Sequence, residues 1–317
     1  MKKITEQLDI KLGKAICYSG FREGQSPDAG IFPSYEQIKE DLGILEGHWE
    51  YLRLYACDEQ TDTVLEVIRN EKFDFQVMLG AYIGAEMNNF ACPWGGVYSE
   101  GQLLANKEHN INQIEKLIKL ANQYPDIVFA LSAGNEATVN WTDHYVPVEN
   151  VIRYVNIIKK GAKQPVTFCE NYMPWLDHIK DLVEAVDFIS IHTYPVWEYK
   201  NIHEALEYTK QNYYSIAEKY PHKAVVITEA GWATNSNGRG IDPANVSEEF
   251  QKIYYQDLMK WTQKEKILCF YFEAFDESWK GSPEPLEPEK HWGLFTMDRK
   301  PKKVMKNQFL LKDNRYE

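Results

Sequence analysis

Two glutamates in this sequence stand where a buried strand pattern stops, and they are the residues best suited to do chemistry. VVITEAGWAT, residues 225–234, begins with β-branched and apolar residues and reaches Glu229 just before a glycine and a tryptophan. IVFALSAGNEA, residues 127–137, closes in the same way on Asn135 and Glu136. Most enzymes that cleave glycosidic bonds use a pair of carboxylic acids as their catalytic residues. The sequence therefore predicts a catalytic pair, provided that the fold brings the two strand ends together.

The surroundings of the two glutamates suggest different roles for them. The side-chain amide of Asn135 is suited to bind a sugar hydroxyl next to the reacting carbon, an interaction that strengthens in the transition state. We expect Glu229 to stay ionised as the nucleophile and Glu136 to act first as acid and then as base. This is the retaining arrangement, which requires carboxyl groups about 5 to 5.5 Å apart.

A buried arginine is expected close to this pair. Arg53 lies inside the apolar run WEYLRLYACD, residues 49–58, and an unpaired buried charge costs several kcal/mol. We therefore expect carboxylates to hold Arg53, near a catalytic glutamate. A structural ion pair at the far end of the fold is the alternative.

Further polar and aromatic residues follow other apolar runs. The segment 188–198 ends in a dense group that includes His192, for which a hydrogen-bonded supporting role is favoured. Flat aromatic faces suit the flat faces of sugars, although core packing is an equally strong explanation for a tryptophan. The candidates for substrate binding are Tyr194, Trp197, Glu198, Trp232 and Trp279.

The positions of the apolar runs predict the architecture. Eight such runs begin near residues 15, 49, 75, 126, 165, 186, 224 and 267. Most intervals contain one stretch with helical periodicity, including a helix opened by Ser34, and helices over 103–123, 148–161 and 245–264. Alternation of strands and helices implies parallel pairing, and eight units close a (β/α)8 barrel. We expect one catalytic domain over residues 1–317, with an N-terminal extension (1–13) and a C-terminal tail (300–317).

Composition and charge exclude several classes of partner. The net charge of −12 would repel phosphates and anionic lipid, so a neutral polysaccharide or oligosaccharide is favoured over nucleic acid. No C-x-x-C pair exists, the eight histidines are scattered, and no G-x-G-x-x-G follows the first run, so we expect neither a metal nor a cofactor. No run of about 18 apolar residues spans a membrane. The start of the chain carries no recognisable signal peptide, while a polysaccharide substrate favours export. We expect a monomer.

The motifs together resemble a known family. N-E after the fourth run and T-E-A-G-W after the seventh resemble the clan of barrel glycosidases that carry catalytic glutamates on these strands. F-D-E-S-W-K after the eighth run and C-Y after the first are similar to glycoside hydrolase family 17, the β-1,3-glucanases, and the chain looks like a bacterial-type member. The resemblance covers essentially the whole chain.

The resemblance implies roles for individual residues. It implies Glu136 as acid/base and Glu229 as nucleophile. Glu277 and Lys280 would be a supporting polar pair, and Tyr18 would lie near the nucleophile. Trp197 and Glu198 look like the residues that hold acceptor sugars in family members. Plant members carry G-W-P-S and F-N-E where this chain has G-W-A-T and F-D-E, which affects subsite preference and not the catalytic pair.

Three functions follow from these observations. The favoured one is a retaining endo-β-1,3-glucanase acting on laminarin-like glucans. A β-1,3-glucanosyltransferase would use the same covalent intermediate and pass it to a sugar hydroxyl. A non-catalytic glucan-binding barrel is the alternative from a different class, and the presence of both glutamates argues against it.

Overall fold

The chain forms a closed barrel of eight parallel strands. A computed structural model describes residues 2–8 and 10–306, and within these the strands pair in sequence order, with β1 pairing β8 to close the barrel. The strands are β1 (Ala15–Cys17), β2 (Tyr51–Leu54), β3 (Gln76–Gly80), β4 (Val128–Asn135), β5 (Val166–Asn171), β6 (Ile189–His192), β7 (Val225–Ala230) and β8 (Cys269–Tyr271). Each of the eight predicted runs contains one of these strands, so the predicted (β/α)8 fold is confirmed.

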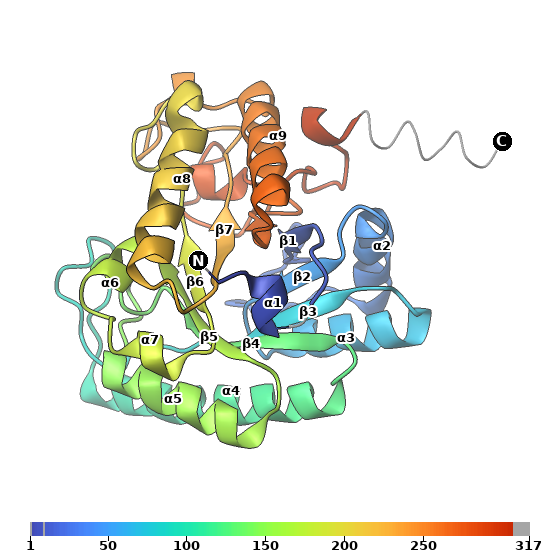
Figure 1. The fold of residues 1–317 in the computed structure, drawn as a ribbon. Coiled ribbons are helices and arrows are strands. Elements are labelled where there is room, and N and C mark those ends of the chain that lie inside the picture. The colour runs from blue at the N-terminus through green and yellow to red at the C-terminus, as the bar shows by residue number, and fades with distance from the viewer. Residues whose placement is uncertain (1, 9, 307–317) are drawn as a thin grey trace.

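Helices surround the barrel (Figure 1). They are α1 (Ile4–Leu8), α2 (Tyr35–Leu45), α3 (Glu59–Glu71), α4 (Glu100–Gln123), α5 (Val148–Gly161), α6 (Tyr172–Leu176), α7 (Leu182–Ala185), α8 (Ile202–Lys219) and α9 (Glu248–Glu265), with short 3-10 helices at Pro243–Asn245 and Pro288–Lys290. Within the described residues, none of these helices combines the length and apolarity that crossing a bilayer requires.

Local capping fixes where several helices begin. Ser34 caps α2 in a reciprocal capping box with Gln37, as the sequence predicts. An equivalent box starts α4 after Ser99, three residues before the expected position. The hydroxyl of Ser247 accepts a hydrogen bond from the backbone of Phe250, so α9 begins at Glu248 and not at 245.

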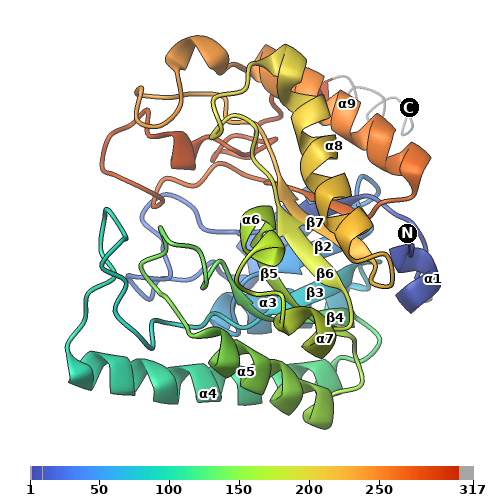
Figure 2. The same cartoon turned by 60° about the vertical axis from the view of Figure 1, so that its left-hand side comes forward.

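The strands are buried on both faces, which is why they read as continuous apolar runs. The long loops that follow β3 and β4 extend on one side of the barrel, and α1 lies on the opposite side (Figure 2). Residues 1 and 307–317, parts of the predicted extension and tail, lie outside the described residues. The carboxyl ends of parallel barrel strands share one face, where the predicted site residues converge.

Candidate active site

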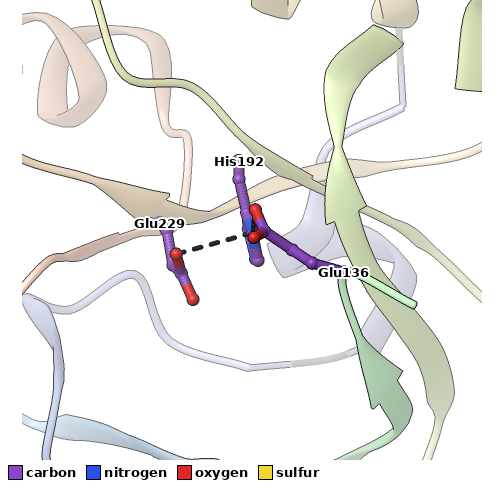
Figure 3. A group of neighbouring side chains, drawn as sticks. All are labelled: Glu136, His192 and Glu229. Atoms are coloured by element: carbon purple, nitrogen blue, oxygen red, sulfur yellow. Dashed lines mark hydrogen bonds and ion pairs between the residues drawn. The ribbon is translucent and has the colours of Figure 1, made fainter. Parts of the chain in front are cut away.

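The two glutamates meet across the barrel mouth. Glu136 directly follows β4 and Glu229 lies near the end of β7. One carboxylate oxygen of each, together with a ring nitrogen of His192, lie within 4.8 Å of one another. Figure 3 shows the two carboxylates facing each other, with His192 beside both. Residues 93 positions apart in the chain (229 minus 136) are thus brought to the spacing that a retaining glycosidase uses.

Irregular backbone positions these side chains. The strand register shifts between Ser132 and Asn135 on β4 and between Ile191 and His192 on β6. Glu136 itself has a left-handed backbone, with φ of +45°. Such bulges and left-handed residues turn a side chain away from the regular alternation of a strand. Here they occur directly before Glu136 and at His192.

Glu229 is buried and surrounded by donors. The guanidinium of Arg53 forms an ion pair with its Oε1, and the Tyr55 hydroxyl donates to the same oxygen at 3.0 Å. The Tyr194 hydroxyl donates to Oε2 at 2.5 Å. Burial would raise the pKa of Glu229, but the positive charges of His192 and Arg53 and these hydrogen bonds outweigh it and lower the pKa to about 2. Glu229 is therefore ionised at neutral pH, as a nucleophile must be.

Arg53 meets the expectation drawn from its burial. It is 2% exposed, and besides Glu229 it donates to the side-chain oxygen of Asn135. The prediction that a carboxylate near the site holds this arginine is confirmed. Because Arg53 contacts both Glu229 and Asn135, it fixes the Glu229 carboxylate relative to the Asn135 amide, next to Glu136.

His192 connects the two glutamates. Its Nδ1 lies 2.7 Å from Oε1 of Glu136 and 3.5 Å from Oε2 of Glu229 (Figure 3). Burial disfavours the charged imidazolium, but Glu229, Cys169 and Glu136 outweigh burial and raise the pKa of His192 to about 10. The supporting role expected for His192 becomes more direct here, because it touches both members of the pair.

A second polar network lies after β8. Lys280 forms ion pairs with Glu273 at 2.8 Å and with Glu277 at 2.5 Å. Glu277 also accepts hydrogen bonds from the hydroxyl of Ser19 and from the indole of Trp279. Burial would raise the pKa of Glu277, but Lys280 outweighs it and lowers that pKa. The structure thus brings Glu277 and Lys280 into contact, and adds Glu273 as a third member.

Tyr18 lies elsewhere than predicted. Its hydroxyl donates to Asp41 at 3.1 Å, and the tyrosines whose hydroxyls reach Glu229 are Tyr55 and Tyr194. Tyr18 is completely buried and supports the start of the loop after β1. Its proximity to Asp41 explains the difference, because a buried hydroxyl takes the nearest strong acceptor.

The prediction that Trp232 binds substrate is wrong. Its side chain is 0% exposed, its indole donates to the backbone oxygen of Asn245 at 3.1 Å, and its ring packs on Tyr254. A ring enclosed in this way fills the space between β7 and α9 and cannot touch a ligand.

Two of the other predicted aromatic residues, Tyr194 and Trp197, form one wall of the site, whereas Trp279 packs on Phe21 and donates to Glu277. Tyr194 and Trp197 both pack against Trp292, with ring centroids 5.1 and 6.2 Å apart. Trp197 is partly exposed, and Glu198 beside it is exposed. Because Tyr194 also donates to Glu229, this wall adjoins Glu229 directly.

The group Glu136, His192 and Glu229 also presents three potential metal-ligand atoms. However, Arg53 places a positive charge in ion-pair contact with Glu229, where a cation would add to it. The arrangement therefore suits proton and glycosyl transfer better than metal binding.

Sequence reasoning did not single out three residues. Tyr55 follows β2 and Glu273 follows β8, and both are strand-end positions that could have been found by that rule alone. Glu289, in the loop after β8, lies near the catalytic pair. Burial, together with the charges of Glu136 and other nearby carboxylates, raises its pKa to about 7 although Lys280 opposes this.

Proteins with related sequences carry the names of glucan-hydrolysing enzymes. The chain is 24% identical over 299 residues to a glucan 1,3-beta-glucosidase of Arthroderma benhamiae, covering 89% of this chain and 88% of that protein. It is 27% identical to a probable glucan endo-1,3-beta-glucosidase btgC of Aspergillus flavus. That alignment covers 86% of this chain and 40% of the longer Aspergillus protein.

Solved structures share the barrel. An endo-laminarinase from Formosa Hel1_33_131 has a TM-score of 0.81 and 29% identity, with 98% of this chain and 90% of that chain covered. A glycoside hydrolase family 17 β-1,3-glucanosyltransferase from Rhizomucor miehei has a TM-score of 0.70, with 92% and 95% covered, and its 21% identity shows the shared fold alone.

The family match decides the assignment. Residues 15–293 match the family described as BtgE/BtgC glycoside hydrolase domain, a range that runs from β1 past β8 and includes both glutamates. This chain belongs to the BtgE/BtgC glycoside hydrolase family.

Proposed function

We propose that this protein is a retaining endo-β-1,3-glucanase that hydrolyses laminarin-like glucans by double displacement. The observation that carries the proposal is the approach of one oxygen of Glu136 and one of Glu229 to within 4.8 Å. The likeness to an endo-laminarinase at 29% identity supports the substrate class.

In the first step, Glu229 attacks the anomeric carbon of the sugar while Glu136 protonates the departing sugar oxygen. This bond exchange leaves the sugar attached to Glu229 as an ester and Glu136 deprotonated. Arg53, Tyr55 and Tyr194 hold Glu229 in place for the attack. Asn135, oriented by Arg53, is placed to bind the hydroxyl next to the reacting carbon.

In the second step, Glu136 takes a proton from water, which attacks the same carbon and releases Glu229. His192 touches both carboxylates, so it can balance the charge that moves between them. Two inversions leave the β configuration unchanged.

The experiment compares Glu229→Gln and Glu136→Gln with wild type, measuring reducing sugar released from laminarin. Glu229→Gln should abolish hydrolysis, and Glu136→Gln should reduce it by roughly 10²- to 10⁴-fold. Glu108→Gln, an exposed change on α4, is the matched control. Thermal unfolding checks that each variant folds. Substantial activity in folded Glu229→Gln would remove this residue from its role.

Azide adds a second arm that reports on the covalent intermediate. In Glu136→Ala, an oligosaccharide with an activated leaving group that departs without protonation still forms the intermediate. Azide then attacks this intermediate without needing a general base, and should restore turnover and give a β-configured glycosyl azide. An α-configured product would contradict the retaining mechanism.

Transfer to another sugar is the second candidate. The partly exposed rings of Tyr194 and Trp197, which pack on the buried Trp292 beside Glu229, favour it, because an acceptor sugar bound there would compete with water. Products longer than the starting oligosaccharide at high substrate concentration indicate transfer. A glucan-binding barrel without turnover is separated from both by the absence of any new reducing ends.

The remaining proposals concern the whole protein. Residues 1–317 act as one catalytic domain with an N-terminal extension (1–13) and a C-terminal tail (300–317), and the protein works as a monomer on a neutral β-glucan rather than on nucleic acid. Glu277, Lys280 and Trp279 support the site from the β8 side, and Trp197 with Glu198 binds sugar. A polysaccharide substrate favours a periplasmic or secreted location.

A further inference from the structure

Three aromatic side chains are exposed at the rim of the barrel, on the loops that follow β3 and β4. Phe90 is 81% exposed, Trp94 is 58% exposed and Trp141 is 40% exposed. We call these three residues the rim platform. Large exposed rings gathered on neighbouring loops are unusual for a protein surface and mark a place where a partner or ligand binds.

The two loops that carry the rim platform are tied together. The side-chain amide of Asn89 donates to the backbone oxygens of Asn140 and Thr142, both at 2.8 Å. The thiol of Cys92 donates to the backbone oxygen of Trp141 at 3.2 Å. These bonds place residues 89–92 next to residues 140–142. Hydrogen bonds between the two loops therefore hold the backbone that carries these rings.

The chemistry of these loops fits a neutral ligand. Residues 87–98 and 137–142 contain no aspartate, glutamate, lysine, arginine or histidine, in a protein whose net charge is −12. Asp143 and His144, which directly follow the second segment, pair with each other at 2.8 Å, and Asp143 lies against Gly95. The flat apolar faces of sugar rings need no charged group, because they bind aromatic faces by stacking.

The rim platform is continuous with the catalytic site. Trp141 lies five residues after Glu136 (141 minus 136) on the same loop. On the same two loops, the half-exposed Tyr82 packs on His144 with ring centroids 5.4 Å apart, and His144 Nε2 is 2.9 Å from the backbone oxygen of Asn135. The loops that carry the rim platform thus also contact Asn135, the residue before Glu136.

We propose that Phe90, Trp94 and Trp141 form an outer subsite for the glucan chain, which holds β-linked glucose units beyond those at the catalytic pair. The proposal rests on the proposed function, since it extends the same substrate. It places binding for a long chain on the β3–β4 side, opposite the wall of Tyr194 and Trp197. A short oligosaccharide that fills only the catalytic pair does not reach it.

The kinetic test uses Trp94→Ala/Trp141→Ala with a long laminarin and with laminaritriose. The KM for laminarin should rise by about tenfold, because two stacking faces are lost, and turnover of laminaritriose should stay within about twofold. Trp94→Phe/Trp141→Phe, which keeps flat rings, should recover most of the affinity. Ile157→Ala, an exposed apolar change on α5, is the control. An unchanged KM for laminarin overturns the proposal.

A binding test separates this proposal from the proposed function. Glu229→Gln is run on native gels with and without laminarin, alone and combined with Trp94→Ala/Trp141→Ala. Retardation by laminarin that the platform changes abolish supports the site, even if the wild type shows no hydrolysis. Equal retardation overturns the site and leaves the hydrolase proposal standing. A wild-type dimer in sedimentation that the platform changes dissociate would assign this face to self-association instead.

Discussion

At the scale of single residues, His192 has the most specific consequence for the reaction. Replacing it in His192→Asn keeps a hydrogen-bonding side chain but removes the positive charge beside Glu229. Since that charge helps to lower the pKa of Glu229 to about 2, the pKa of Glu229 should rise. The nucleophile must be ionised, so the acidic limb of the kcat/KM profile should move to higher pH by at least about one unit.

The measurement is a pH profile of kcat/KM on laminarin for wild type, His192→Asn and the control His203→Asn, which lies exposed on α8. A purely structural role would lower kcat/KM equally at all pH values. An acidic limb that does not move would contradict the electrostatic role of His192.

The sequence predicted the charged residues of the site better than its rings. Glu136, Glu229 and Arg53 could be found because a charge at the end of, or inside, an apolar run has few structural explanations. Trp232 could not be placed, because an indole is equally suited to the core and to a sugar face. The contacts of Tyr55 depend on barrel closure, which brings β2 and β7 together.

At the scale of elements, the close approach of β7 and β8 depends on Gly231. A Cβ at this position would overlap the backbone oxygen of Phe272. Gly231→Ala should therefore push the segment after Glu229 away from β8, destabilise the protein by about 3 kcal/mol and lower activity. This explains the glycine of the T-E-A-G-W motif as a packing requirement.

The matched change is Gly43→Ala in α2, where a Cβ would meet nothing within 4 Å. It should stabilise the protein by about 0.5–1 kcal/mol, because glycine is unfavourable inside a helix. Denaturant unfolding and laminarin hydrolysis measure both variants. If Gly231→Ala were as stable as wild type, the backbone of β8 would have to be more adaptable than the structure indicates.

The elements themselves were largely predictable, and their boundaries less so. Periodicity located α5 at 148–161. It placed the start of α4 at 103, because the capping box at Ser99 and Gln102 precedes the apolar pattern that signals a helix. Between β5 and β6 the described chain forms only the short helices α6 and α7. The spacing of apolar residues in this part of the sequence did not predict a helix.

At the scale of the whole molecule, distant parts of the chain are joined by a buried ion pair. Arg299 donates to both carboxylate oxygens of Asp41 at 2.8 Å and to the backbone oxygen of Gly20 at 2.8 Å. The pair connects the segment after β8 with α2 and the loop after β1, across the seam where the barrel closes. Arg299→Met leaves Asp41 buried with less compensation, and should cost about 3–5 kcal/mol.

The control is Arg69→Met, which removes an exposed partner of Asp126 and should cost about 1 kcal/mol or less. Chemical denaturation of the two variants and wild type provides the comparison. Equal stabilities for Arg299→Met and Arg69→Met would show that this seam does not hold the barrel together.

The barrel as a whole followed from counting apolar runs, since eight strand–helix units have one common closed arrangement. The seam contacts did not follow from the sequence. Asp41 and Arg299 are 258 residues apart (299 minus 41) and lie in a helix and a loop, where charged residues are ordinarily exposed. Their pairing exists only because the barrel closes.

The groups around Glu229 also affect the relative rates at which the covalent intermediate forms and breaks down. His192, Arg53 and Tyr194 lower the pKa of this carboxylate and make it weakly basic, and a weakly basic carboxylate is a good leaving group. The ester between sugar and Glu229 should then break faster than it forms. Intact mass spectrometry during turnover should find mostly unmodified wild-type protein, whereas Tyr194→Phe should accumulate a sugar adduct. An adduct that dominates in the wild type would contradict this.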